Sequence, residues 1–231
     1  MREITYETAA NEAIQEEFRR NPKTLHLATD LPIELRREFG PDRIRVTPIA
    51  ENNFVGAALG LAGSGWRTVA NIRMATFGFV ALDQMMNHAA KITYMFGGQA
   101  EFPVLYRMTV GAGFQGAAEH SISPYAMYMN VPGLKIILPS TPYDVKGLLK
   151  TALRENNPVV SFEHFLLGGM KGEVPEKEYL IPFGKAAIKR KGNDVTVVAL
   201  AKMVHEALHV ADELESKGIS VEVIDPRTLV P

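Results

Sequence analysis

The sequence has no cysteine, no long hydrophobic run and no excess of charge of one sign. Without cysteine, disulfides, cysteine-type zinc fingers and thiol nucleophiles are excluded. No apolar run reaches the roughly 18 residues of a membrane-spanning helix, and the first residues predict an amphipathic helix rather than a secretory signal. Lys plus Arg is 25 and Asp plus Glu is 26, a net charge of −1, which argues against nucleic-acid or anionic-membrane binding. We therefore expect a cytoplasmic protein without these two partners.

The 231 residues, 46% hydrophobic and 22% charged, are typical of an ordinary globular protein with one large domain or two modest ones. Short apolar runs rich in β-branched residues alternate with helical stretches. The expected strands are 25–29, 68–72, 103–108, 134–138, 158–162, 195–201 and 220–225, and the expected helices are 8–20, 51–62, 79–95, 142–155 and 203–217. This alternation predicts an α/β fold, a parallel twisted sheet with helices on both faces.

A stretch rich in glycine, proline and charge separates two parts of the chain. We expect a first domain over 1–175, a linker over 176–193 and the beginning of a second α/β domain over 194–231. Only two strands are expected in that last part, and a two-stranded sheet is marginal alone. We therefore expect the second domain to be incomplete here or to pack onto something else.

Two short motifs match known functional patterns but are better explained by ordinary structure. His205-Glu206-Ala207-Leu208-His209 matches the zinc-protease pattern H-E-x-x-H, but no third ligand follows, so an ordinary amphipathic helix is the better interpretation. Residues 111–116 read G-A-G-F-Q-G, yet the acidic residue that a dinucleotide site needs about 20 residues later is missing. A flexible glycine loop that shapes a pocket is the better interpretation there.

Two other residues are candidates for chemistry. Glu51 stands at the start of a helix of small residues that follows a short extended piece. It either complements the helix dipole or is a carboxylate in apolar surroundings that can transfer a proton. His120 directly follows the glycine loop, so its ring can project into whatever the loop surrounds; a satisfied structural histidine is the alternative. A serine hydrolase is disfavoured because no G-x-S-x-G elbow is present.

Several segments together resemble the β subunit of the E1 component of thiamine-diphosphate-dependent 2-oxo acid dehydrogenases, the pyruvate, branched-chain and acetoin group. The resemblance runs in order along nearly the whole chain. The matching segments are 47–51 (TPIAE), 82–84 and 94–99, 119–121 (EHS), 131–135, 139–148, 157–160, 171–175 and 225–229 (DPRTL).

The resemblance implies a transketolase-like pyrimidine-binding domain followed by the start of a transketolase C-terminal domain. It implies that thiamine diphosphate lies between subunits. In an α2β2 heterotetramer, the E1 α subunit would hold the diphosphate through Mg²⁺, and the β subunit would hold the aminopyrimidine. It also implies a 2-oxo acid substrate and acyl transfer to a lipoyl-bearing E2 acyltransferase.

The same resemblance assigns roles to single residues. Glu51 corresponds to the glutamate on a pyrimidine nitrogen, which stabilises the tautomer that removes the thiazolium C2 proton. Phe77 corresponds to the aromatic residue stacked on the pyrimidine, and Ile49 to a residue lining that pocket. His120 corresponds to the histidine that serves acyl transfer. Some members bind K⁺ through a cluster that maps to Val104, Ala152, Leu153, Glu155 and Asn157.

The chain departs from the family pattern at several places. Ala28-Thr29-Asp30 replaces a frequent Gly-Glu-Asp, the loop 31–39 is short, and Arg73 and Met74 precede the stacking aromatic residue. These departures leave two alternatives beside the dehydrogenase subunit. One is a subunit of a split transketolase-type enzyme, and the other is a non-catalytic structural paralogue.

Overall fold

A seven-stranded sheet forms the centre of the computed structural model, which describes residues 1–230. Its strand order is β12-β6-β7-β5-β4-β2-β3, and every neighbouring pair is parallel except β12 with β6. The strands are β2 (Thr24–Ala28), β3 (Ile44–Val46), β4 (Arg67–Met74), β5 (Val104–Val110), β6 (Lys135–Ile137), β7 (Val159–His164) and β12 (Thr228–Val230). All residues of β2 and β7 are buried, as expected for strands covered on both faces. The predicted α/β class is confirmed.

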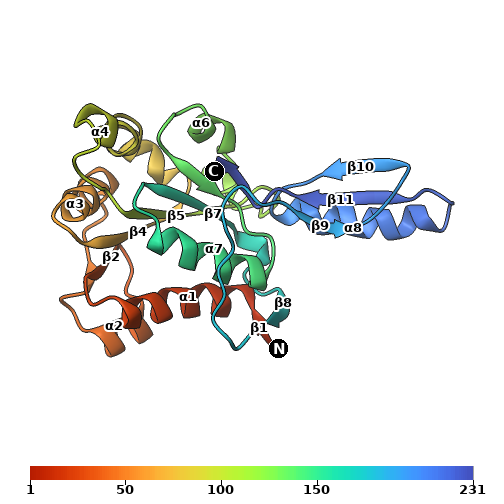
Figure 1. Cartoon of the computed structure of the whole chain (residues 1–231), viewed down its shortest axis with the longest axis horizontal. Helices are drawn as coiled ribbons and strands as arrows, with labels where there is room; N and C mark the ends of the chain where they lie inside the picture. The colour runs from red at the N-terminus through yellow and green to blue at the C-terminus, as the bar shows by residue number, and fades with distance from the viewer. Residues whose placement is uncertain (231) are drawn as a thin grey trace.

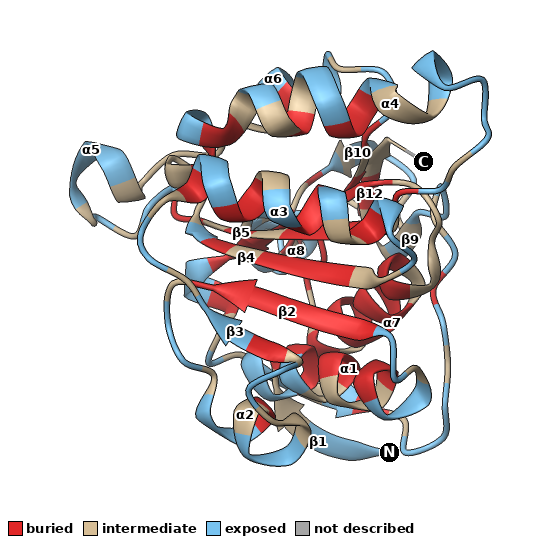
Figure 2. Ribbon diagram, turned by 90° about the vertical axis from the view of Figure 1, so that its left-hand side faces the viewer, coloured by how far each residue is buried: buried red, intermediate tan, exposed pale blue. Residues whose placement is uncertain are grey.

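Helices cover both faces of this sheet (Figure 1). One face carries α1 (Tyr6–Arg20) and α7 (Pro142–Arg154), whose apolar sides enclose Phe18, Leu105 and Leu148. The other face carries α3 (Glu51–Gly63), η1 (Phe77–Ala81), η2 (Asp83–Ala89) and α4 (Ala90–Met95). The shorter helices are α2 (Ile33–Phe39), α5 (Ala117–His120), α6 (Tyr125–Met129) and η3 (Phe165–Leu167). Figure 2 shows β2 wholly buried, while α5 protrudes from the body.

The helix expected over 79–95 is divided into a 3-10, a π and an α segment. Its buried positions Ala81, Met85 and Ala89 recur every four residues. Positions four apart lie on the same face of a helix, and all three residues belong to the core on this side of the sheet.

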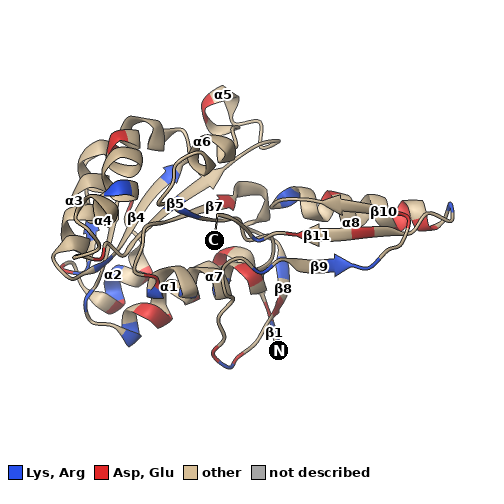
Figure 3. Ribbon diagram, turned by 45° about the horizontal axis from the view of Figure 1, so that its top comes forward, with Lys and Arg blue, Asp and Glu red and all other residues tan. Residues whose placement is uncertain are grey.

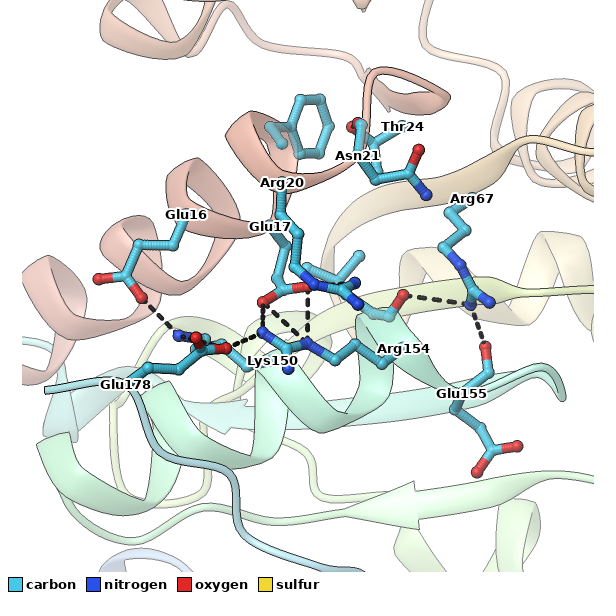
Figure 4. Close-up of polar contacts among 12 residues, drawn as sticks. Glu16, Glu17, Arg20, Asn21, Thr24, Arg67, Lys150, Arg154, Glu155 and Glu178 are labelled. Atoms are coloured by element: carbon cyan, nitrogen blue, oxygen red, sulfur yellow. Dashed lines mark hydrogen bonds and ion pairs between the residues drawn. The ribbon is translucent and has the colours of Figure 1, made fainter.

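Lys and Glu side chains join α1 to α7. Lys150 Nζ lies 2.6 Å from Glu16 Oε2, and Arg154 Nη2 lies 2.6 Å from Glu17 Oε1 (Figure 4). Lys150 is 2% exposed, so its charge is stabilised by the carboxylates of Glu16 and Glu178 rather than by water. Figure 3 shows charged residues on the helices and loops and few on the strands of the large sheet.

A second, smaller unit follows, with the strand order β10-β11-β9. It comprises β9 (Ala187–Arg190), β10 (Val195–Val198), β11 (Val221–Asp225) and α8 (Lys202–Glu215) and projects from the main body (Figure 1). The segment 176–193, expected as a linker, thus contributes β9, which pairs antiparallel with β11. After β11 the chain returns to the large sheet as β12.

Two more strands form a separate small sheet. The N-terminal strand β1 (Arg2–Thr5) pairs antiparallel with β8 (Lys171–Val174), which comes much later in the chain. Among residues 1–230, no helix combines the length and the apolar character needed to cross a membrane.

Candidate active site

The predicted site residues follow neighbouring strands of the large sheet. Glu51 begins α3 shortly after β3, Phe77 begins η1 after β4, and His120 ends α5 after β5. The strands β3, β2, β4 and β5 are parallel neighbours, so their carboxyl ends lie at one edge. In open parallel sheets this edge is where ligands bind.

Glu51 is 9% exposed, although its carboxylate takes part in none of the hydrogen bonds or ion pairs found within residues 1–230. It lies in the first turn of α3, whose N-cap Ala50 offers no side-chain acceptor to the helix. Its oxygens are not among the fully buried polar atoms that lack a partner within residues 1–230, so they reach the surface and can bind a ligand. Ile49, two residues earlier, is 84% exposed.

Phe77 and His120 are in direct contact. Their ring centroids lie 5.4 Å apart with an interplanar angle of 87°, an edge-to-face arrangement. The preceding residues are also joined, because the Thr76 hydroxyl donates to the carbonyl oxygen of Glu119. The structure therefore brings together two residues that lie 43 positions apart and whose contact the sequence did not predict.

The loop between β5 and α6 folds back on itself beneath His120. The carbonyl oxygen of His120 lies so close to Gly111 that a Cβ there would meet it at 2.0 Å, and a Cβ at Gly116 would meet the His120 Cβ at 2.9 Å. Gln115 and Ala117 have φ values of 64° and 58°, a strained conformation that is frequent at functional sites. The glycines of the G-A-G-F-Q-G segment thus allow the close approach of His120.

A buried ion pair fixes the strands on which this loop stands. Arg107 of β5 donates two hydrogen bonds to the Glu163 carboxylate of β7, at 2.8 and 2.6 Å. Burial lowers the pKa of the Arg107 guanidinium, but the Glu163 carboxylate outweighs it and the net shift is upward. The bidentate geometry holds the carboxyl ends of β5 and β7 in register.

One histidine for which we predicted no role, His164, lies beside this loop. It ends β7 and is 6% exposed. Its ring lies 3.1 Å from the carbonyl oxygen of Ala112, a residue of the loop that carries His120. Its position at the end of a buried apolar strand was the available sequence signal.

The two histidines of the H-E-x-x-H segment have separate partners. His205 Nε2 lies 2.7 Å from the carbonyl oxygen of Ser140, and His209 Nε2 lies 3.3 Å from Glu213 Oε1. They lie on α8, as the amphipathic interpretation predicts. Residues 1–230 contain no group of three or more His, Asp or Glu side chains placed to hold a metal ion.

An arginine stands among the residues that map to the potassium cluster. Arg67 Nη1 donates to the carbonyl oxygens of Leu153 and Glu155, at 3.2 and 2.6 Å. The Glu155 carboxylate accepts from Lys135 Nζ at 2.6 Å and from Asn157. The carbonyl oxygens of Leu153 and Glu155 therefore already face Arg67, and the Glu155 carboxylate already faces Lys135, so the oxygens of these two residues do not fit a further cation.

The departures near residues 30 and 73 lie at the same edge of the sheet and pair with each other. Arg73 Nη1 lies 2.9 Å from Asp30 Oδ2, with both side chains about half exposed. Arg73 adopts a φ of 67° at an irregularity in the pairing of β4 with β5.

Comparisons with known proteins identify the two parts of the chain. Residues 2–167 match the transketolase pyrimidine-binding domain, and residues 184–231 match the transketolase C-terminal domain. Among solved structures, a split-gene transketolase described as an inactive β4 tetramer superposes with a TM-score of 0.81 and 26% identity. The superposition covers 98% of this chain and 72% of that one.

Curated relatives are similar over most or all of the chain. The β subunit of acetoin:2,6-dichlorophenolindophenol oxidoreductase from Cupriavidus necator is 44% identical over 100% of this chain and 73% of its own length. The E1 β subunit of pyruvate dehydrogenase from Bacillus subtilis is 39% identical over 100% and 74%. The acetoin oxidoreductase β subunit of Bacillus subtilis is 49% identical over 85% of this chain, which spans 58% of that relative.

Proposed function

The chain belongs to the family of β subunits of thiamine-diphosphate-dependent 2-oxo acid dehydrogenases, and on this premise we propose that it acts in the oxidative decarboxylation of a 2-oxo acid. The observation that carries the proposal is the unpartnered Glu51 carboxylate at the sheet edge that also holds Phe77 and His120. The reaction would transfer an acyl group to a lipoyl group. The cytoplasmic location stays a prediction.

Glu51, Phe77 and Ile49 would hold the aminopyrimidine of thiamine diphosphate. Glu51 lacks a partner within residues 1–230 and can share a proton with a ring nitrogen, while the half-buried Phe77 ring offers a flat apolar surface. When bound, the cofactor supplies the nucleophilic carbon and the electron sink for decarboxylation. Glu51 would hold or return the proton at the ring nitrogen, as a general acid–base.

His120 would serve the later acyl-transfer step. Its ring contacts Phe77 edge-on, so it lies at the rim of the surface that would hold the pyrimidine. An imidazole there can donate a proton to, or accept one from, the acyl group and the incoming lipoyl sulfur.

A second subunit would complete the site. Ile49 is 84% and Val80 66% exposed, and Phe79 is also exposed. Ile49 stands just before α3, and Phe79 and Val80 lie in η1, which packs beside α3. Exposed apolar side chains gathered near a ligand site mark a protein interface. We assign this surface to an E1 α subunit, which would hold the diphosphate through Mg²⁺ in an α2β2 heterotetramer, with a lipoyl-bearing E2 acyltransferase as the further partner. Potassium has no part in this proposal, because Arg67 and Lys135 already face oxygens of Leu153 and Glu155, two of the five residues that map to its cluster.

Acetoin is the second candidate substrate. The relatives at 44% and 49% identity are named as acetoin oxidoreductase β subunits, whereas the pyruvate dehydrogenase subunit is 39% identical. Cleavage of acetoin would use the same residues and would release acetaldehyde in place of CO₂, and the two-carbon unit that remains would become an acyl group on oxidation by the lipoyl group or the dye.

The test is reconstitution with an E1 α subunit and assay of a panel of 2-oxo acids, acetoin and sugar phosphates. Oxidative turnover is measured as the reduction of dichlorophenolindophenol, and transketolase-type turnover as the formation of a new sugar phosphate. We expect cofactor-dependent turnover that falls by about 10²–10⁴-fold in Glu51→Gln, the range of general acid–base effects. Near-normal turnover in this variant would refute the role of Glu51. Turnover only with sugar phosphates would favour a transketolase-type subunit, and a stable complex without turnover would favour a structural paralogue.

A further inference from the structure

His164 lies where β7 meets the loop of its neighbour β5. Its register partner across the sheet is Val110, the last residue of β5, and Gly111 and Ala112 follow directly. At 6% exposure, the ring is enclosed at the point where the loop that carries His120 leaves the sheet.

Hydrogen bonds to both nitrogens define the state of the His164 ring. The backbone N–H of Leu166 donates to His164 Nδ1 at 3.3 Å, so Nδ1 carries no proton. Nε2 therefore carries the proton of the neutral ring and donates to the carbonyl oxygen of Ala112 at 3.1 Å. Burial lowers the pKa of His164, although the hydrogen bond to Ala112 opposes this effect. The lowered pKa favours the neutral ring, in which Nε2 donates to Ala112.

The residue after His164 makes a second contact with the same loop. The next residue, Phe165, packs its ring on Phe114 of the loop, with centroids 3.9 Å apart. Within the loop, Gly111 N donates to the Ile122 carbonyl at 3.3 Å and Gly116 N donates to the Ser121 hydroxyl at 2.9 Å. His120 rests on the two glycines of this closed loop, so a shift at Ala112 moves the backbone beneath His120.

We propose that His164 is a positioning residue, which fixes the 111–123 loop through Ala112 and thereby sets His120 against Phe77. This inference rests on the proposed acyl-transfer role of His120. His164 itself has no contact with Phe77 or Glu51 among the hydrogen bonds and ring contacts of residues 1–230, so it acts through the loop.

Two variants separate the hydrogen bond from the volume of the ring. His164→Leu keeps an apolar side chain of similar size but leaves the Ala112 carbonyl and the Leu166 N–H unpaired. His164→Gln places an amide N–H near the position of Nε2 and can restore the bond to Ala112. His209→Leu on α8, where the ring is 73% exposed, is the matched control.

The first measurement is amide hydrogen exchange of the chain alone, which requires no cofactor or activity. We expect exchange of residues 112–120 to rise at least about tenfold in His164→Leu, equivalent to about 1.4 kcal/mol of local stability. It should change less than threefold in His164→Gln and in the control. Unchanged exchange in His164→Leu would overturn the proposal.

The second measurement uses the reconstituted enzyme. We expect kcat to fall at least about tenfold in His164→Leu with less than threefold change in KM, and to recover in His164→Gln. In a His120→Ala background, His164→Leu should cost nothing further. Hydrogen–deuterium exchange at the cofactor's C2, which depends on Glu51, should stay within threefold of the wild-type rate.

An equal loss of kcat in the His120→Ala background, or an equal fall in C2 exchange, would show a merely structural role. A wild-type complex inactive on every substrate would refute the proposed function, while the amide-exchange result would still decide the role of His164.

Discussion

At the scale of single residues, two glycines have opposite surroundings. A Cβ at Gly111 would meet the His120 carbonyl oxygen at 2.0 Å, whereas nothing lies within 4 Å of a Cβ at Gly60. We expect Gly111→Ala to cost about 1–3 kcal/mol, as overpacking does, and to lower Tm by about 3–10 °C. We expect Gly60→Ala to add about 1 kcal/mol, because Gly60 lies inside α3 and alanine favours a helix.

Thermal melting of the isolated chain measures both effects. The test is specific because Tm should fall in Gly111→Ala and rise in Gly60→Ala. Limited proteolysis locates the change, since only Gly111→Ala should increase cleavage in the 111–123 loop. A Gly111→Ala protein that melts with the wild type would mean that His120 is not packed on this glycine.

Residue types and their setting made Glu51 and His120 candidates, and the family resemblance added Phe77, but neither predicted their contacts. The strands before Phe77 and His120 are apolar runs that the sequence made visible, whereas β3 before Glu51 was expected only as a short extended piece. The contact of Phe77 with His120 and the bonds of Arg67 to the Leu153 and Glu155 carbonyls join residues far apart in the chain. Such contacts depend on tertiary packing, for which the sequence has no local signal.

At the scale of elements, the junction of α1 with α7 should make stability depend on pH. Although partial burial raises the pKa of the Glu16 carboxyl, hydrogen bonds from Lys146 and Lys150 lower it below its ordinary value of 4.5. A carboxyl with a lowered folded-state pKa stabilises the fold above pH 4.5 and loses this effect as pH falls through the folded-state pKa. We expect Glu16→Gln to cost about 1–2 kcal/mol at pH 7 and to lower Tm by about 2–8 °C.

The difference between the two melts should shrink steadily below pH 4.5, because the wild-type carboxyl is then protonated as well. Glu7→Gln is the control, since Glu7 is exposed on the same helix and pairs with no cation within residues 1–230. A Glu16→Gln deficit that is as large at pH 3 as at pH 7 would contradict the assignment to the ion pairs.

The predicted strands of the large sheet are largely buried and apolar, whereas β1 and β8, which were not predicted, are short and largely exposed. The buried strands β2, β5 and β7 are apolar runs that can be recognised locally. The strands β1 and β8 are short and largely exposed, and they pair across about 170 residues. Their formation depends on a partner that only the folded chain supplies.

At the scale of the whole molecule, the two units are joined by buried charges at a seam. Asp144 of α7 and Asp225 of β11 are both fully buried. Lys189 of β9 lies 2.6 Å from Asp144 Oδ2 and 3.5 Å from Asp225 Oδ2, and Arg227 Nε lies 2.9 Å from Asp144 Oδ1. Periodicity predicted α7 and β11, but neither β9, which lies in the expected linker, nor the return of the chain through β12 to the large sheet.

Removal of the lysine should weaken the attachment of the smaller unit. Lys189→Met leaves two buried carboxylates with Arg227 as their remaining cation. Breaking a buried pair costs about 3–5 kcal/mol, so with Arg227 still present we expect about 2–4 kcal/mol and a fall in Tm of about 4–15 °C. Amide exchange should rise first in β9 and β11. Lys191→Met, an exposed lysine next to β9 that pairs with no carboxylate within residues 1–230, should melt with the wild type.

Acid should partly rescue this variant, opposite to its effect on the junction of α1 with α7. Burial raises the pKa of Asp225, while its Ser140 hydrogen bond and Lys189 oppose the rise, so Lys189→Met raises it further. A carboxyl with a raised folded-state pKa favours folding most at low pH, and this contribution is lost as pH rises through the folded-state pKa. The deficit of Lys189→Met should therefore be smaller at pH 5 than at pH 8. Since removing both partners costs less than leaving one buried and unpaired, Lys189→Met with Asp225→Asn should recover at least half of the loss. A deficit that is independent of pH and unchanged in the double variant would show that these charges do not hold the seam.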